Sequence, residues 1–452
     1  MTEIQQPSSP RDAIAAVRAQ LQVVATEIIP LAQCNGRVLA QAIHADRDSP
    51  ALDVSAMDGF AVRMADLIVM AGENGLPVAA LEKVSDAIVG GDAVIVGGSA
   101  AIVGSGIANV SDGSANMSEA MIGHAQIQMR TGKAVRIVTG APIPIGADVV
   151  VRYEDVVVNN GGVRLMIEAS AIKTGANIRR RGENAKCGDE IARAGVVIDA
   201  ATIGAMASFG VAQVVGRKRV RVALVTTGDE LVDAHDQAQP WQVRDSNGPV
   251  LESLLGARPW IEIVSRTHAR DDADTLADTL TRAMDIADAV ILTGGVSMGH
   301  KDFVPQVAAR LGARTIFHKL PQRPGRPMFA AVRPAVGAIA PRLILGLPGN
   351  PVSVMVTARR LGLEMLGALA GISAPHFAAH TRGVANADNA TLPMWWYRLV
   401  GESMNADGIN ELHLLSGKGS GDIAAAASSV GFVEVAPGQH TVGAHNFYAW
   451  KH

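Results

Sequence analysis

Short apolar runs alternate with amphipathic stretches between residues 219 and 370. Runs with the length and composition of buried strands occupy residues 220–225, 260–264, 289–292, 315–319, 328–332 and 343–347. Stretches with helical spacing of apolar positions occupy residues 246–255, 273–285, 303–312 and 351–370. Strands that alternate with helices predict an α/β domain with a mostly parallel sheet, and ligands bind at the carboxyl ends of the strands in such a sheet.

The two ends of the chain have other patterns. Residues 10–34 combine helical spacing, at Ala13, Val17 and Leu21, with an apolar run that ends at Pro30. After residue 372 the strand-like segments are separated by glycine and polar turns, and they occupy residues 393–400, 410–415 and 430–435. This spacing predicts a small all-β domain at the C-terminal end.

The stretch 65–125 fits neither pattern. Ile-Val-Gly triplets begin at residues 88, 95 and 102, seven residues apart. A coiled coil has this register, but each glycine costs a helix about 1 kcal/mol. Short strands joined by glycine turns, or a low-complexity expansion, agree better with this composition.

Length and charge narrow the class of protein. The chain has 452 residues and a formal net charge of −3 at pH 7. It is long enough for about three or four domains, and its nearly balanced charge gives no electrostatic basis for binding nucleic acid. Its two cysteines, Cys34 and Cys187, are too few for a disulfide framework or a four-ligand zinc site. Residues 93–110 lack charge, but their glycines and serines disfavour a membrane span, so we expect a cytoplasmic protein.

A glycine turn follows one of the predicted strands. The strand at residues 289–292 leads into Gly294 and Gly295, and Ser297 and Asp302 precede the next helix. A strand–glycine–helix connection presents backbone N–H groups to an anion, although an ordinary turn has the same pattern. The carboxylate of Asp302 would either cap the helix or bind a metal ion.

Charged residues gather near the predicted strand ends. The acids are Asp58, Asp229, Glu230, Asp245, Asp271 and Asp302. Clustered carboxylates suit a hard cation such as Mg²⁺. The cations Lys319, Arg323 and Arg326 lie in a proline-containing segment, which holds them in place. Together these groups suit an anionic substrate that is handled with a metal ion.

Two further segments have more than one interpretation. The arginines at residues 179–181 either form a solvated basic face or bind phosphate oxygens through their guanidinium groups. The stretch SGKGSG at residues 416–421 is no P-loop, because no strand leads through it into a helix. A plain loop and a substrate-binding turn both remain open for it.

Six motifs occur in the order that characterises a known family. They are SAMDGFAV at residues 55–62, TGAPIP at 139–144, TGDEL at 227–231, TGGVSMGHKD at 293–302, PGRPM at 324–328 and LPGNP at 347–351. With these motifs the chain resembles the molybdopterin molybdenumtransferase family, which includes MoeA and the gephyrin E domain. The resemblance covers nearly the whole chain, with a poor match at about residues 65–125.

The resemblance implies a multidomain fold of the α/β plus β class. A central Rossmann-like, mostly parallel α/β domain that binds molybdopterin would occupy residues 179–371, with its core from about 217. An N-terminal mixed domain would comprise residues 8–56 and 140–178, and a β-rich domain would be inserted at 57–139. A small C-terminal β-barrel domain would occupy residues 372–452.

The resemblance also implies an activity. The protein would be a transferase of molybdenum cofactor biosynthesis that inserts molybdate into adenylylated molybdopterin, with Mg²⁺ as cofactor. It would release AMP and give Mo-molybdopterin. A molybdopterin adenylyltransferase would be its protein partner, and the chain would form a homodimer, because family members are elongated dimers.

The same resemblance assigns the site residues. The acidic catalytic residues would be Asp58, Glu230, Asp271 and Asp302, and the metal ligands among them Asp58, Glu230 and Asp302. The residues that would bind the substrate or an oxyanion are Thr227, Gly228, Gly294, Gly295, Ser297, Lys319, Arg323, Arg326, Pro348, Gly349, Asn350 and Ser416.

The chain departs from the family in three places. Asn184 stands where the family motif has Asp, so the acceptor oxygen is kept and the charge is lost. His300 replaces an acidic residue that is common in the family, and the stretch 65–125 is altered. A non-catalytic molybdopterin-binding or scaffold homologue is therefore the alternative to the transferase. The choice between molybdate and tungstate stays open.

Overall fold

The computed structural model describes residues 6–70, 81–87, 128–159, 162–296, 303–373 and 380–451. The chain divides into two compact units, a large unit of Met1–Ile43 with Ile191–His452 and a small unit of His44–Glu190. Most of the stretch 65–125, with its Ile-Val-Gly triplets, lies outside the described residues, as do Ser297, His300 and Asp302. No helix of the described residues is long and apolar enough to cross a membrane.

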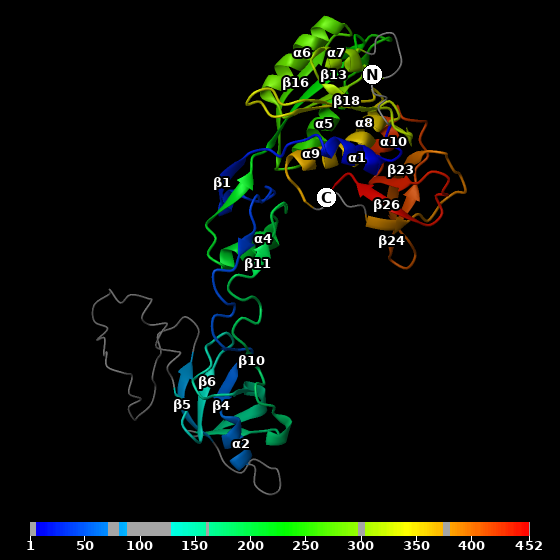
Figure 1. Cartoon of the computed structure of the whole chain (residues 1–452). Helices are drawn as coiled ribbons and strands as arrows, with labels where there is room; N and C mark the ends of the chain where they lie inside the picture. Colours follow the sequence, from blue (N-terminus) through cyan, green and yellow to red (C-terminus); the bar gives the residue numbers. More distant parts are fainter. Residues whose placement is uncertain are drawn as a thin grey trace. The chain divides into compact units, whose positions relative to one another are not determined.

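A mostly parallel sheet forms the centre of the large unit (Figure 1). In spatial order its strands are β16 (Ile261–Ala269), β13 (Val220–Thr227), β17 (Ala289–Thr293), β21 (Arg342–Leu347), β20 (Phe329–Arg333) and β18 (Arg314–His318). The first four strands run parallel, and β20 and β18 are antiparallel to their neighbours. The alternation of apolar runs and helices predicted this arrangement.

Helices cover both faces of this sheet. They are α5 (Asn247–Gly256), α8 (Pro351–Thr357), α9 (Leu363–Leu369) and α1 (Pro10–Arg18) on one face, and α6 (Ala273–Ile286) and α7 (Val304–Arg310) on the other (Figure 1). Successive residues of β13 point to opposite faces. Leu224 therefore packs in the core under α5 and α8, whereas Val225 packs under α6 and α7.

The predicted helix at residues 351–370 contains a π-helical turn, Ala358–Gly362, between α8 and α9. Arg360 in this turn is buried and donates to Glu364 at 2.8 Å and to Glu434 at 2.5 Å. Glu434 belongs to the C-terminal sheet, so the turn ties the helix to that sheet.

The C-terminal sheet curls around its own core. Its strands are β19 (Gln322–Arg323), β23 (Trp395–Met404), β25 (Gly431–Val435), β26 (Ala444–Ala449) and β22 (His380–Gly383), with β24 (Asn410–Leu414) also on β23. A bridge between Val384 and Leu412 links the end of β22 to β24. The strand order therefore returns to its starting point. The sequence analysis missed β22 and β26.

Shorter elements complete the large unit. They are β1 (Thr26–Pro30), α4 (Ala200–Ser208), β12 (Gln213–Arg217), β14 (Leu231–Val232), β15 (Val243–Arg244) and α10 (Ile423–Ala427). β1 pairs antiparallel with β12, and β14 pairs with β15 directly after the TGDEL motif. The two short strands β2 (Ile43–His44) and β11 (Glu190–Ala192) lie where the two units meet along the chain.

The small unit is built on a β-sheet. Its strand order is β7 (Val149–Arg152), β4 (Gly59–Val62), β6 (Lys133–Ile137), β5 (Leu81–Ala87), β9 (Gly162–Leu165) and β8 (Val156–Asn159). The helix α2 (Met64–Met70) and the strand pair β3 (Val54–Ser55) and β10 (Ile178–Arg179) belong to the same unit. The strands at residues 149–165 share a sheet with β4, whereas the sequence analysis had placed them with the N-terminal domain.

Candidate functional site

Three glycine turns follow neighbouring strands of the parallel sheet. Thr226 pairs with Thr293, and Thr293 pairs with Leu347, so β13, β17 and β21 end side by side. The turns that follow hold six of the residues predicted to bind substrate, Gly228, Gly294, Gly295, Pro348, Gly349 and Asn350, and Thr227 is the last residue of β13. We call this region the carboxyl edge.

Close packing at the carboxyl edge explains why glycine is needed at residue 294. Its φ of +89° is left-handed, and a Cβ there would lie 2.8 Å from the backbone oxygen of Thr227. The Gly294 N–H also donates to the Leu347 carbonyl at 3.2 Å. Any side chain at residue 294 would therefore push the turn away from β13.

The acids at the carboxyl edge have several partners. The Asp229 N–H donates to Asp271 at 3.4 Å, and the Asp271 N–H donates back to Asp229 at 3.2 Å. This reciprocal pair joins the ends of β13 and β16. The carboxylate of Glu230 folds back over Gly228, where a Cβ would lie 2.8 Å from its Oε1. Asp245 accepts from the Gly248 N–H at 3.0 Å at the start of α5.

The predicted metal site is only partly described. In the part of the chain that the structure describes, one group of three carboxylates and imidazoles could hold a metal ion, and it consists of the exposed Asp233, His235 and Asp236. Glu230 and Asp271 lie at the carboxyl edge, Asp302 is outside the described residues, and Asp58 belongs to the small unit. The metal ligands therefore stay a prediction.

Asp58 lies in a turn between β3 and β4 of the small unit. Its Oδ1 accepts from the Thr139 N–H at 2.7 Å and from the Thr139 hydroxyl at 2.8 Å. These two hydrogen bonds lower the pKa of Asp58 below its ordinary value. Gly59 is required beside it, because a Cβ would lie 2.0 Å from the backbone oxygen of Val151. The sequence motif thus holds an ionised carboxylate in a fixed turn.

The arginines at residues 179–181 are engaged by acids and amides of the small unit. Arg180 donates to Asp53 at 2.6 Å, and Arg181 donates to Asp48 at 2.5 Å. Arg179 donates to the side-chain oxygen of Asn184. The three arginines are therefore partly solvated and already paired, which disfavours a free phosphate-binding fork. Asn184 serves as a partner of Arg179 together with Glu183, which lies 3.6 Å from Arg179.

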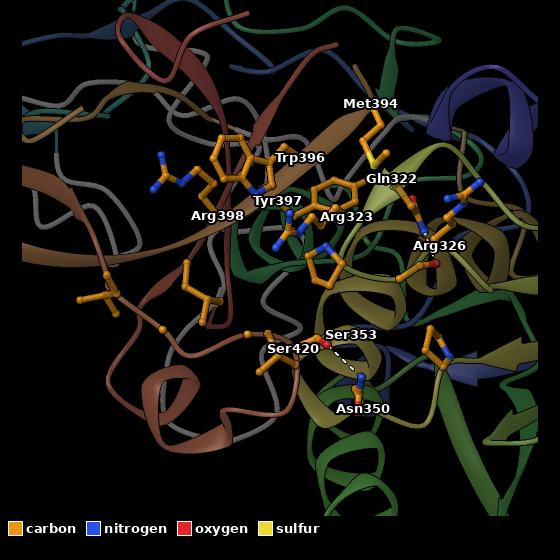
Figure 2. Close-up of a pocket in the computed structure, with 18 of the residues that line it drawn as sticks. Gln322, Arg323, Arg326, Asn350, Ser353, Met394, Trp396, Tyr397, Arg398 and Ser420 are labelled. Atoms are coloured by element: carbon orange, nitrogen blue, oxygen red, sulfur yellow. Dashed lines mark hydrogen bonds between the residues drawn. The ribbon is translucent and has the colours of Figure 1, made fainter. Parts of the chain in front are cut away.

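A cavity of about 1020 Å³ lies in the large unit between the helix α8 and the C-terminal sheet (Figure 2). Five of the residues predicted to bind substrate line it, namely Arg323, Arg326, Pro348, Asn350 and Ser416. Thr227, Gly228, Gly294, Gly295, Gly349 and Lys319 are not in its lining. The predicted set is therefore divided between the carboxyl edge and this cavity, and Pro348 and Asn350 connect the two.

The segment that carries Arg323 and Arg326 is held by its own hydrogen bonds. The Leu320 N–H donates to the Arg326 carbonyl at 2.9 Å, and the Gln322 amide donates to the Gly325 carbonyl at 2.9 Å. The buried hydroxyl of Tyr397 donates to Gln322 at 3.1 Å. Burial raises the pKa of Tyr397 well above its ordinary value, so the hydroxyl keeps the proton that it donates. The two arginines are therefore positioned by a rigid backbone.

Asn350 is the residue before α8, but its side chain makes no capping hydrogen bond. Its amide donates instead to the Ser420 hydroxyl at 2.9 Å, which Figure 2 shows as a dashed line. The amide of Asn350 thus has its partner in the 416–421 loop. That loop is thereby fixed against the start of α8.

The charges around the cavity favour an anion. Asp388 lines it, but Arg398 donates to this carboxylate at 2.6 Å and Thr441 donates at 2.6 Å, which lowers the pKa of Asp388 to about 2. Among the described residues, neither Arg323 nor Arg326 forms an ion pair. Arg323 and Arg326 therefore both line the cavity with their charge unmatched, and their side chains extend in different directions (Figure 2).

Sequence reasoning missed part of the lining. The missed side chains include Gln322, Ser353, Asp388, Met394, Trp396, Arg398 and Ser420. Trp396 and Arg398 are stacked, with the guanidinium carbon 4.3 Å from the ring centroid. Their alternation in the strand-like run 393–400 was a usable signal, since it places both on one face of β23.

Comparisons with known proteins agree on one family. Residues 8–210 match the family model described as "MoeA N-terminal region (domain I and II)", and residues 223–368 match "Probable molybdopterin binding domain". A molybdopterin molybdenumtransferase from Nostoc sp. is 32% identical over 351 residues, which are 77% of this chain and 70% of that one. The enzyme of the same name from Synechococcus elongatus is 33% identical over 75% of this chain and 74% of its own length.

Solved structures agree on the fold. The molybdopterin biosynthesis MoeA protein from Pyrococcus horikoshii matches with a TM-score of 0.73 at 20% sequence identity, over 98% of this chain and 100% of that one. At that identity the likeness concerns the fold alone. It supports a multidomain α/β plus β architecture along the length of the chain.

Proposed function

This chain belongs to the molybdopterin molybdenumtransferase family, and on that premise we propose that it inserts molybdate into adenylylated molybdopterin and releases AMP. The observation that carries the proposal is the cavity of about 1020 Å³ that Arg323 and Arg326 line without a carboxylate partner among the described residues. Paired guanidinium forks match the oxygens of tetrahedral oxyanions and of phosphates.

The proposal assigns distinct tasks to the two parts of the site. Arg323 and Arg326 hold the oxyanion, and the hydroxyls of Ser353 and Ser416 supply neutral donors beside them. The glycine turns of the carboxyl edge let the backbone approach the substrate closely. Pro348 and Asn350 lie at both places, so a substrate could extend from one to the other.

Mg²⁺ suits the acids of the carboxyl edge. Glu230 and Asp271 offer hard oxygen donors, and Mg²⁺ in proteins usually takes one or two carboxylates together with substrate phosphates. When bound, the ion would offset negative charge on the phosphates of the substrate. Asp58 and Asp302 stay expectations from the resemblance. A cytoplasmic homodimer that receives its substrate from a molybdopterin adenylyltransferase completes the proposal.

Purified protein incubated with adenylylated molybdopterin, molybdate and Mg²⁺ tests the proposal. We expect release of AMP that depends on molybdate, together with cofactor that activates an apo molybdoenzyme. Binding of adenylylated molybdopterin without release of AMP would favour the alternative, a non-catalytic homologue. The replacement of the family's Asp by Asn184 is the reason for considering that alternative.

A further inference from the structure

A second cavity of the large unit lies at the opposite end of the parallel sheet. It has a volume of about 860 Å³, and its lining includes Arg219 and Arg221 at the start of β13, Glu262 in β16 and Arg342 at the start of β21. We call it the amino-edge pocket. The glycine turns of the carboxyl edge follow the other ends of the same strands, so this pocket is separate from the candidate site.

Cations outnumber acids in the amino-edge pocket. The cations are Arg37, Lys218, Arg219, Arg221 and Arg342, and the acids are Glu27, Glu262 and Asp288. Asp288 accepts from Arg342 at 3.2 Å and lies 3.7 Å from Arg221, while Glu27 is paired with Arg37. Two of the three acids are therefore already matched within the pocket.

Lys218 and Arg219 supply the excess positive charge. Both are exposed next to each other, just before β13, and neither side chain has a hydrogen-bond or ion-pair partner among the described residues. With the unpaired Glu262 included, the five cations and three acids leave the pocket with a net charge of about +2, which suits one dianion.

Arg37 adds positive charge to the wall of the pocket. It is only 7% exposed, and its Nη2 donates to Glu27 and to the Arg217 carbonyl. Its Nε has no hydrogen-bond partner among the described residues, but it is buried and cannot be reached from the pocket. Arg37 therefore contributes to the field of the pocket and donates no hydrogen bond to a ligand.

The wall of the pocket is not purely polar. Val23 is 39% exposed and Ile339 is 47% exposed, and both line the pocket together with Leu369. Apolar lining beside a few convergent cations is typical of sites for small organic ligands, and the volume is in their range. A bare inorganic ion would leave this apolar wall without a contact.

We propose that the amino-edge pocket binds a small organic phosphate monoester. Its phosphate would be held by the exposed side chains of Lys218 and Arg219, and its organic part would contact Val23 and Ile339. Phosphate monoesters carry close to two negative charges at neutral pH, which matches the excess of cations. The proposal does not rest on the proposed transferase activity.

Calorimetric titration of the full chain with phenyl phosphate tests the pocket. We expect the Lys218→Gln/Arg219→Gln variant to bind phenyl phosphate at least tenfold more weakly at this site, and binding by the wild type to weaken as salt is added. Arg323→Gln/Arg326→Gln should leave this site unchanged. Arg282→Gln removes an exposed cation of α6 and is the matched control for lost charge.

Four outcomes would overturn the proposal. The first is equal affinity of the Lys218→Gln/Arg219→Gln variant and the wild type. The second is loss of all binding in Arg323→Gln/Arg326→Gln, which would place the ligand in the other cavity. The third is a change from dimer to monomer in the Lys218→Gln/Arg219→Gln variant, measured by light scattering, which would assign the surface to a second copy of the chain. Inorganic phosphate should bind more weakly than phenyl phosphate, and equal affinity would contradict an organic ligand.

Discussion

The arginines at residues 179–181 and those at residues 323 and 326 have opposite surroundings. In the small unit, Arg180 and Arg181 contact Asp53 and Asp48 at 2.6 Å and 2.5 Å. In the large unit, Arg323 and Arg326 line a cavity and form no ion pair within the described residues. The first group stabilises a turn, whereas the second group has charge available for a ligand.

The difference lies in what each backbone brings close. Asp48 and Asp53 precede the arginines by more than a hundred residues, and strand pairing between β3 and β10 brings the two segments together. The segment 320–327 instead bonds to itself and to Tyr397, which is neutral. A guanidinium group that is paired with a carboxylate gains little from binding a further anion, because the carboxylate already offsets its charge.

Removing both cavity arginines should give the largest effect. We expect Arg323→Gln with Arg326→Gln to lower the molybdate-dependent release of AMP by about a hundredfold or more, because each charge-assisted hydrogen bond contributes about 1.5–3 kcal/mol. Arg180→Gln with Arg181→Gln is the matched control and should change the same rate less than threefold. Steady-state rates of all variants at saturating Mg²⁺ check this.

An equal loss of activity in the two double variants would contradict the comparison. It would mean that the ion pairs of the small unit open to bind substrate. Circular dichroism of both variants separates this outcome from misfolding, and the control pair should cost little stability because both arginine side chains are more than half exposed.

Two glycines extend the comparison to the backbone. Gly294 and Gly312 have positive φ values of 89° and 77°, but only Gly294 would place a Cβ against backbone, whereas Gly312 faces open space. Gly312→Ala should cost only about 1 kcal/mol of unfolding free energy, and Gly294→Ala should cost about 2–4 kcal/mol and reduce turnover. Urea unfolding checks both. Equal costs would show that the carboxyl edge can relax.

Much of the fold follows from local pattern. The helices α5 and α6 and the strands β13, β17 and β21 lie within a residue or two of their predicted bounds, because apolar runs and helical spacing record burial directly. The strand β22 was missed because its burial pattern, eeie, contains no buried position. The strand β26 was missed although three of its six residues are buried, because its sequence, AHNFYA, has no regular alternation of apolar and polar residues. The π-helical turn was missed because its residues have ordinary helical spacing.

The site was harder to predict than the fold. Motifs located the glycine turns, and strand pairing places those turns at one edge, as parallel strands require. No local signal could show that Arg180 and Arg181 are paired with Asp53 and Asp48, because these contacts join segments distant in sequence. For the same reason the partner of Asn350, Ser420, was not foreseen.

The acids of the small unit offer a smaller test. Asp48 and Asp53 accept from arginines, whereas Asp58 accepts from the backbone and hydroxyl of Thr139, which lower its pKa from the ordinary value of 3.8. Thr139→Val removes only the hydroxyl, so the pKa of Asp58 should rise part of the way back. Carboxyl-carbon NMR titration measures this rise, and an unchanged pKa would contradict the role of the hydroxyl.

The sign of the pH dependence follows from the lowered pKa. A carboxylate whose pKa is depressed in the folded state stabilises the protein above its unfolded-state pKa, and this contribution is lost as the pH falls through the folded-state pKa. The wild type should therefore exceed Thr139→Val in unfolding free energy at pH 7. The Asp58-dependent part of that difference should disappear only once the pH is below the folded-state pKa of Asp58, which itself lies below 3.8.

The smallest effect is expected at Asn184. Its side-chain oxygen accepts from Arg179, and its amide donates to the Ser49 hydroxyl at 3.3 Å. In Asn184→Asp the new charge would lie against Arg179, so the fork that now bonds an amide would bond a carboxylate. The added negative charge is then largely offset where it arises. A charge without a partner would instead strengthen Mg²⁺ binding and repel molybdate, each by several-fold.

We therefore expect Asn184→Asp to change the Mg²⁺ and molybdate concentrations for half-maximal activity less than threefold. It should add at most about 0.5 kcal/mol of stability, as exposed ion pairs do. Titration of both ligands on the wild type and the variant checks this. The double variant Arg179→Gln/Asn184→Asp leaves the new carboxylate without its arginine partner. If residue 184 acts on the site, this variant alone should need less Mg²⁺ and more molybdate for half-maximal activity. Unchanged titrations in the double variant would show that residue 184 does not affect Mg²⁺ or molybdate binding. Asn184 would then only stabilise the turn to which it belongs.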